Sequence, residues 1–188
     1  MNRIAKSEQI IDLKSGLLKA GDFITAEKKL KQLEGVFKDE QARQAMDQEQ
    51  HIYTVQAHLP EEENTPGGLF WGTTKIEAGK VGNEYFMTRG HFHSKLQTAE
   101  YYWCISGTGV LIYMDTNRNC WGVEMAPGSL HYINKGVAHR VANTGDSPLI
   151  INACWPSDAG HNYEEIDMNG FSARLFEEKG IPILIPDK

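Results

Sequence analysis

Long apolar segments are missing from this chain of 188 residues. No run approaches the roughly 20 apolar residues that a membrane-spanning helix requires, so we expect no association with a membrane. The first sixteen residues carry charges throughout and have no apolar centre, so we expect no secretory signal there. These two absences favour a soluble protein that acts inside the cell.

Basic charge is also scarce. The chain has 19 Lys and Arg against 25 Asp and Glu, which gives a net charge of −6. Proteins that bind nucleic acids need a surplus of basic residues to neutralise phosphates. The charge balance therefore predicts no nucleic-acid partner.

Cysteine is rare, and its spacing excludes two common uses. The three cysteines, Cys104, Cys120 and Cys154, are odd in number and form no C-x-x-C pair. They are typical of reduced, mostly buried thiols and not of a disulfide framework or a zinc cluster. We therefore expect a cytoplasmic location.

The sequence divides at about residue 50. Lys, Glu, Gln and Ala dominate residues 25–50, and their apolar residues recur at nearly helical spacing. There we predict two short helices, capped by Thr25 and Asp39. We expect residues 1–50 to form a helical and extended segment, packed on a barrel formed by residues 51–188. The two parts make one domain.

Beyond residue 50 the sequence favours short strands. Apolar and β-branched runs alternate with Gly, Pro, Asn and Asp, and the breakers include the segments 66–68, 107–109 and 144–148. Many short strands at regular spacing predict an all-β sandwich or barrel. The predicted strands span residues 51–57, 69–76, 85–93, 99–105, 109–114, 120–125, 130–133, 137–142 and 148–155.

Three of these strands carry a set of metal-binding side chains. His91 and His93 are two residues apart, so they share one face of a strand, and Phe92 points the other way. Glu100 opens the next strand, and His139 lies on a third. Three imidazoles and one carboxylate suit a first-row divalent metal. One histidine alone is more often a hydrogen-bonded core or surface residue.

These residues match a family pattern. The chain resembles the cupin superfamily, whose first motif has His-x-His, then Glu, then Gly, here His91, His93, Glu100 and Gly107. The second motif is similar to residues 134–143, which contain His139 and end at Asn143, with Asn134 in the place of a proline. The resemblance implies a jelly-roll β-barrel with short N-terminal helices. Six residues separate His93 from Glu100, where most cupins have three or four.

The long gap narrows the resemblance. Together with the segments 33–40, 79–95, 138–148 and 155–163, it resembles the cupin-type glucose-6-phosphate isomerases over most of the chain. The DAGHNY segment at 158–163 counts most, because a generic cupin has no reason to carry it. Trp155 stands where the family commonly has a tyrosine, and this departure concerns the substrate pocket and not the metal site.

This resemblance implies two catalytic residues. Glu100 is the residue implied to move a proton between C1 and C2 of the open-chain sugar. A carboxylate held on a cation is a poorer base than a free one. A metal-assisted hydride shift, with Glu100 only a ligand, therefore stays open. His161 is implied as a proton shuttle; without the resemblance it is read as an exposed loop histidine.

The resemblance also implies the contacts to a phosphosugar. No Gly-x-x-x-x-Gly-Lys run is present, so the phosphate must be held without a P-loop. The residues implied in substrate binding, each with an ordinary structural alternative such as core packing or solvation, are Thr74, Thr88, Gly90, Lys95, Tyr102 and Tyr163.

The implied cofactor is one divalent metal per subunit. We expect Fe²⁺ first, with Mn²⁺, Ni²⁺, Co²⁺ and Zn²⁺ as alternatives, because this ligand set accepts them all. The resemblance also implies a homodimer. Two other classes stay open at this point: another cupin enzyme, such as a different sugar-phosphate isomerase or an iron dioxygenase, and a non-catalytic sugar-binding cupin.

Overall fold

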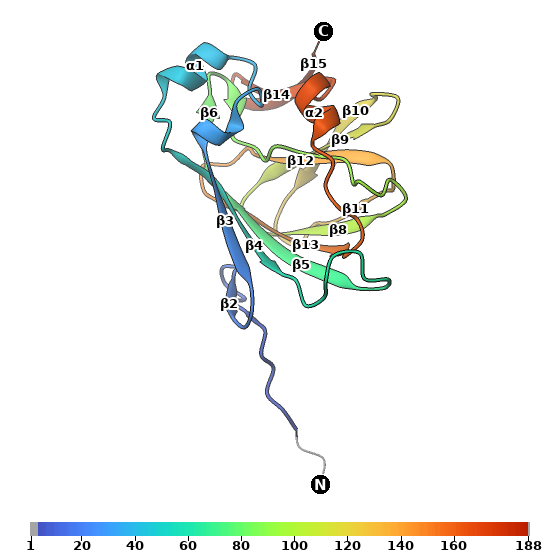
Figure 1. The fold of residues 1–188 in the computed structure, drawn as a ribbon. Coiled ribbons are helices and arrows are strands. Elements are labelled where there is room, and N and C mark those ends of the chain that lie inside the picture. Colours follow the sequence, from blue (N-terminus) through green and yellow to red (C-terminus); the bar gives the residue numbers. More distant parts are fainter. Residues whose placement is uncertain (1–3, 188) are drawn as a thin grey trace.

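Antiparallel strands are the main regular elements of the computed structural model, which describes residues 4–187 (Figure 1). The largest sheet has six strands in the order β11-β8-β13-β5-β4-β3. At its centre Thr73 lies opposite both Gln56 of β4 and Asn152 of β13, and the register shifts by a bulge between Ile150 and Ile151 and between Lys28 and Lys29. The strands are β3 (Ile24–Lys29), β4 (His51–His58), β5 (Leu69–Ile76), β8 (Glu100–Ser106), β11 (Leu130–Ile133) and β13 (Leu149–Pro156).

A second sheet lies across the core from the first. It has three strands in the order β10-β9-β12, with bounds Cys120–Met125, Gly109–Asp115 and Val137–Asn143. Isolated bridges from Met87 to Ala142 and from His91 to His139 lay one more extended segment along β12. Fully buried side chains fill the space between the sheets, among them Leu111, Met114 and Ile151.

Smaller elements cover the ends of this barrel. A four-stranded sheet has the order β15-β14-β7-β6, and β1 pairs with β2 beside the N-terminal tail. The bounds are β1 (Ile10–Ile11), β2 (Leu18–Ala20), β6 (Lys80–Val81), β7 (Glu84–Tyr85), β14 (Ala173–Glu178) and β15 (Ile181–Pro186). The helices are η1, a 3-10 turn at Leu30–Leu33, α1 (Glu40–Ala45) and α2 (Glu164–Asn169).

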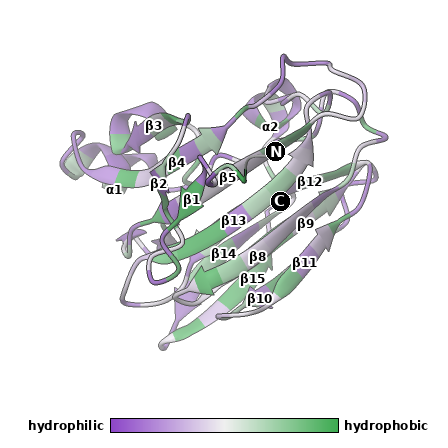
Figure 2. Ribbon diagram, turned by 90° about the horizontal axis from the view of Figure 1, so that it is seen from below, coloured by the Kyte–Doolittle hydropathy of each residue, from purple (hydrophilic) through white to green (hydrophobic). Residues whose placement is uncertain are grey.

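This architecture confirms the predicted all-β jelly-roll barrel with short helices near its N-terminus. Eight of the nine predicted strands are present as β4, β5 and β8 to β13, with bounds within a residue of the prediction. In Figure 2 the apolar colour concentrates on the strands, while the loops are mostly polar. No helix within residues 4–187 has the length and apolarity needed to cross a membrane.

The predicted helices of residues 25–50 are only partly correct. Asp39 caps α1 as expected, and its carboxylate accepts a hydrogen bond from Ala42 N at 2.8 Å. Thr25 caps nothing, because it lies inside β3 and pairs with Gln56 of β4. Pairing with an open sheet edge outweighs the modest helix propensity of this segment. Part of residues 1–50 therefore belongs to the large sheet itself.

The predicted strand at residues 85–93 is wrong. Only Glu84–Tyr85 forms regular strand, and the rest is extended chain with single bridges to three different partners, at Met87, His91 and Phe92. Gly90 interrupts the pleat with a φ of 82°. That left-handed conformation is one that glycine adopts without strain. The alternation of His91, Phe92 and His93 nevertheless persists after the interruption.

Candidate metal centre and its cavity

Two backbone hydrogen bonds fix His91 to His139. His91 N donates to His139 O at 3.2 Å, and His139 N donates to His91 O at 3.1 Å. The bridge brings the two rings within 4.5 Å of each other, centroid to centroid. Phe92 points away into the hydrophobic core, as the alternation predicted, and His93 returns to the side of His91.

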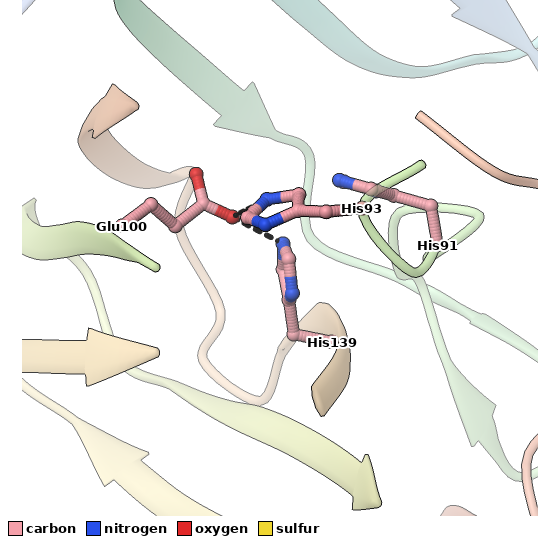
Figure 3. Close-up of side chains that lie close together, drawn as sticks. All are labelled: His91, His93, Glu100 and His139. Carbon is pink, nitrogen blue, oxygen red and sulfur yellow. Dashed lines mark hydrogen bonds and ion pairs between the residues drawn. The ribbon is translucent and has the colours of Figure 1, made fainter. Parts of the chain in front are cut away.

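Glu100 meets these histidines from the opposite sheet. It begins β8, whereas His139 lies on β12, so the cluster joins the two layers of the barrel. Its Oε1 lies 3.0 Å from His93 Nε2 and 2.6 Å from His139 Nε2 (Figure 3). The four residues offer ligand atoms that all lie within 4.8 Å of one another. The predicted convergence of His91, His93, Glu100 and His139 is present.

The outer nitrogens of two histidines are held by neighbouring oxygens. Thr98 Oγ1 donates to Lys95 O at 2.7 Å, so it is free to accept from His93 Nδ1 at 2.9 Å. His139 Nδ1 donates to Val137 O at 3.4 Å. These bonds assign the proton to Nδ1 in both rings. The lone pairs of both Nε2 atoms therefore face the centre, as metal ligation requires.

The charges in the cluster are strongly coupled. Burial alone would raise the pKa of Glu100, but the nearby His139 and His93 outweigh it and lower that pKa to about 2. Burial also lowers the pKa of His91 well below its usual value, with the neighbouring histidines adding to the effect. Glu100 is thus ionised and His91 neutral near pH 7, which are the states that bind a cation.

One buried nitrogen atom has the environment of a metal ligand. His139 Nε2 has no hydrogen-bond partner among residues 4–187, because its approach to Glu100 lacks hydrogen-bond geometry. Ligand atoms about 2.1 Å from one ion lie about 3.0 to 4.2 Å apart, so the observed set needs only a small inward shift to close on a metal. The four side chains fit one divalent ion with positions left for other ligands.

A cavity of about 410 Å³ opens beside the cluster, within the range of small-molecule sites. Its walls come from the inner faces of both sheets. They include five of the residues implied in substrate binding, Thr74, Thr88, Gly90, Tyr102 and Tyr163, together with His91, Glu100, His139 and His161. Trp155, where the sequence departs from the family, also lines the cavity.

The segment containing His161 runs beside the histidine segment. Phe92 and Asn162 exchange two backbone hydrogen bonds, at 2.8 and 3.1 Å, and Lys95 N donates to Ala159 O at 2.9 Å. The His161 ring therefore lies 4.4 Å from that of His91 and stacks on Tyr163, with an interplanar angle of 8°. Enclosure lowers the pKa of His161, so the ring is neutral near pH 7 and able to accept a proton.

Lys95 is the one predicted substrate contact outside the residues that line this cavity. Its exposed ammonium group pairs with Asp158 at 2.5 Å. The cationic residues along the cavity are instead Lys28 and Arg89. Neither residue was predicted from the sequence as a substrate contact. Arg89 could have been, because it lies between the predicted contacts Thr88 and Gly90.

Tyr53 was also missed as a cavity residue. It lies on β4, and burial raises its pKa to about 12, so its hydroxyl stays protonated as a donor. Tyr102, which was predicted, has the same character: burial raises its pKa well above the usual value, and its ring lies 5.4 Å from that of His139. Together with Tyr163, whose pKa burial also raises, the cavity offers three neutral phenols.

Comparison with known proteins places this arrangement in a family. A family model described as glucose-6-phosphate isomerase matches residues 27–182. The chain belongs to this family. The matched range contains the four candidate ligands and the segment with His161.

Curated relatives agree with that placement over most of their length. The glucose-6-phosphate isomerase of Thermococcus litoralis is 40% identical over 81% of this chain and 80% of its own. That of Thermococcus onnurineus is 39% identical over 90% of this chain and 88% of its own. Among solved structures, an oxalate decarboxylase of Bacillus subtilis overlaps 58% of this chain and 27% of its own, with 18% identity and a TM-score of 0.45.

Thr98→Val should weaken metal binding without unfolding the protein. Valine keeps the shape of the side chain but lacks the hydroxyl that accepts from His93 Nδ1 at 2.9 Å, which leaves only the longer contact of Nδ1 with the backbone oxygen of residue 98 at 3.3 Å. Loss of such a partner reduces metal affinity about 10- to 100-fold. Titration with Mn²⁺ followed by electron paramagnetic resonance measures the change. Thr65→Val, which removes an exposed hydroxyl bonded to Glu62 O, is the control and should bind as the wild type does. Equal affinity in all three proteins would contradict the assigned role of Thr98.

Proposed function

We propose that this chain interconverts glucose 6-phosphate and fructose 6-phosphate. The reaction would use one divalent metal held by His91, His93, Glu100 and His139. The observation that carries the proposal is the cavity, which joins this ligand set to His161 in a member of the glucose-6-phosphate isomerase family. Bound there, a divalent ion supplies Lewis acidity that stabilises negative charge developing on the sugar oxygens.

The phosphate would bind between Thr74, Thr88 and Gly90. Thr88 Oγ1 accepts a hydrogen bond from Val141 N at 3.1 Å, which leaves the hydroxyl proton to donate to a phosphate oxygen. Arg89 adds positive charge at this end of the cavity, although it is shared with Asp167 at 2.6 Å. Neutral donors with one nearby cation suit a dianion that must also leave after turnover.

Glu100 would be both a ligand and the base. Its Oε1 faces the histidines, whereas Oε2 makes no hydrogen bond within residues 4–187, and the residue lines the cavity. A group with a pKa of about 2 is a weak base. It therefore needs a substrate carbon made more acidic by the adjacent cation. In this role Glu100 takes the proton from C2 and returns it at C1.

His161 would serve ring opening. It is neutral, lies against His91 and stacks on Tyr163, so its orientation is fixed at the cavity wall. Opening the sugar ring requires removal of the proton from the O1 hydroxyl and delivery of a proton to O5. A neutral imidazole can do the first and, once protonated, the second. In this proposal His161 opens the sugar ring, and Glu100 transfers the proton between C2 and C1.

The isomerase activity should require metal and the two central histidines. Protein treated with a chelator should be inactive, and reloading with Fe²⁺ or Mn²⁺ should restore formation of fructose 6-phosphate in a coupled assay. His91→Ala and His139→Ala should retain neither metal nor activity, while His58→Ala, outside the cluster, should behave as the wild type. Absence of turnover with each of Fe²⁺, Mn²⁺, Ni²⁺, Co²⁺ and Zn²⁺ in a folded protein would refute the assignment.

Glu100→Gln separates proton transfer from a hydride shift. Glutamine keeps an oxygen for the metal but cannot accept a proton, so kcat should fall about 10²- to 10⁴-fold. Metal-loaded wild type in D₂O should place solvent deuterium at C1 of fructose 6-phosphate. Glu77→Gln, which alters a carboxylate paired with Lys75, controls for the loss of charge. Near-normal turnover by Glu100→Gln with full retention of the C2 hydrogen would favour the hydride shift.

The protein is also proposed to form a homodimer in the cytoplasm. Tyr101 of β8 and Tyr132 of β11 are 46% and 52% exposed, and their rings lie 5.1 Å apart beside the exposed Leu130. An outward apolar patch of this kind is typical of an interface. Light scattering should give a dimer mass for the wild type and a monomer mass for Tyr101→Glu combined with Tyr132→Glu. A monomeric wild type would contradict the proposal.

A further inference from the structure

Arg140 is a buried cation directly behind the metal cluster. It follows His139 on β12, so its side chain lies on the opposite face of the strand. The residue is 5% exposed, and its guanidinium carbon lies 4.0 Å from the centre of the Phe171 ring. Such cation–π contacts are strongest where both groups are shielded from water.

The hydrogen bonds of Arg140 go to the histidine segment. Its Nη2 donates to Arg89 O at 2.7 Å, and its Nη1 lies 3.3 Å from the sulfur of Met87. No carboxylate lies within ion-pair distance of the guanidinium among residues 4–187. Burial of an unpaired charge is unfavourable. The side chain is therefore held by contacts with the segment from Met87 to His91 and with Phe171.

Arg140 and Phe171 occupy the space that a side chain at position 90 would need. A Cβ placed on Gly90 would lie 2.8 Å from the Phe171 ring and 3.0 Å from both Cβ and Nε of Arg140. The 2.8 Å separation is too short for two carbon atoms, the 3.0 Å separations are tight, and the φ of 82° adds strain for any other residue. The backbone just before His91 thus passes directly over the guanidinium and the aromatic ring.

Other contacts hold the segment on both sides of Gly90, because the Arg89 side chain pairs with Asp167 and the backbone of Phe92 pairs with Asn162. The bond from Arg140 is the one that reaches the backbone oxygen of Arg89. The bridge between His91 and His139 and the bond from Thr88 N to Val141 O hold it to β12, without a continuous ladder. A ligand must be held within about 0.5 Å of its productive position for tight binding. The bond to Arg89 O lies two residues before His91 and limits movement of the backbone from which that ligand projects.

We infer that Arg140 is a positioning residue for the metal ligand His91, through its hydrogen bond to the Arg89 carbonyl and its packing under Gly90. The inference rests on the proposed metal centre. Arg140 touches neither the ligand atoms nor the cavity that would hold the substrate. Its effect is therefore expected in metal affinity, and only through that in the reaction.

A double-mutant cycle on Mn²⁺ affinity tests this role. Arg140→Met, which keeps the length and the packing on Phe171, should weaken Mn²⁺ binding at least about 10-fold, as expected for loss of a supporting contact. The His91→Ala variant should keep no metal through purification, but His93, Glu100 and His139 still offer Mn²⁺ a weak site when the ion is added in excess. In that background Arg140→Met should change the residual affinity less than about 2-fold, because the ligand it positions is gone. An equal loss in both backgrounds would show a general structural role and overturn the inference.

Arg174→Met is the matched control. Arg174 lines the same small cavity as Arg140, of about 60 Å³, but bonds to Val36 O and Glu84 and not to the histidine segment. It should lower the melting temperature and leave Mn²⁺ affinity at the wild-type value. Arg140→Lys, which keeps the charge and one donor for Arg89 O, should restore part of the affinity.

Further variants and a spectrum distinguish failure of the metal centre from failure of the positioning role. If Arg140→Met does not fold, Arg140→Lys and Phe171→Leu replace it in the cycle, with the same expectation that their effect vanishes without His91. The electron paramagnetic resonance spectrum of bound Mn²⁺ should also change in Arg140→Lys, because the position of one ligand changes. If wild-type protein binds no Mn²⁺, the metal centre itself is wrong. If it binds Mn²⁺ and Arg140→Met binds equally well, only the positioning role is wrong.

Discussion

An ionised carboxylate buried where the two sheets meet is the constraint on which this site depends. Glu100 is 5% exposed, and its Oε1 is shared by the Nε2 atoms of His93 and His139. A carboxylate removed from water is unfavourable unless positive charge or donors surround it. His93 and His139 stabilise it, and lower its pKa, only when their Nε2 atoms carry protons. With the Nε2 lone pairs turned inward, the two neutral imidazoles cannot supply that charge. A divalent cation can, so the ligand set and the outer bonds to Thr98 and Val137 form one consistent arrangement.

The fold was largely readable because short apolar and β-branched runs are separated by Gly, Pro, Asn and Asp. Residues 51–57 mix apolar and polar side chains, and residues 137–142 are almost entirely buried. Both appear as predicted, in β4 and β12. Residues 24–29 were misread because their composition favours helix, whereas the decisive factor was the free edge of β4. The sequence of residues 24–29 contains no information about a free sheet edge that other residues form. The hairpin of β14 and β15 was also missed.

The candidate site also contains residues that the sequence predicted and residues that it did not. His91, His93 and Glu100 were predictable because a two-residue spacing and a strand start fix where side chains point. The position of the Lys95 side chain was not predictable, because it depends on an ion pair with Asp158, which is distant in sequence. Arg140 carried no signal, since an arginine after a ligand normally reaches solvent. Only the packing of Phe171 and the space left by Gly90 reveal its place.

The six residues between His93 and Glu100 have a structural purpose. Within them Thr98 bonds both His93 Nδ1 and Lys95 O, so the turn that lengthens the loop also orients a ligand. The same loop begins with Ser94 and Lys95, which pair with Gly160 and Ala159 and so draw the next residue, His161, to the cavity wall. With a gap of three or four residues, the chain would have no position equivalent to Thr98, the fifth residue of this loop. The loop length therefore couples ligand orientation to the presence of a second catalytic candidate.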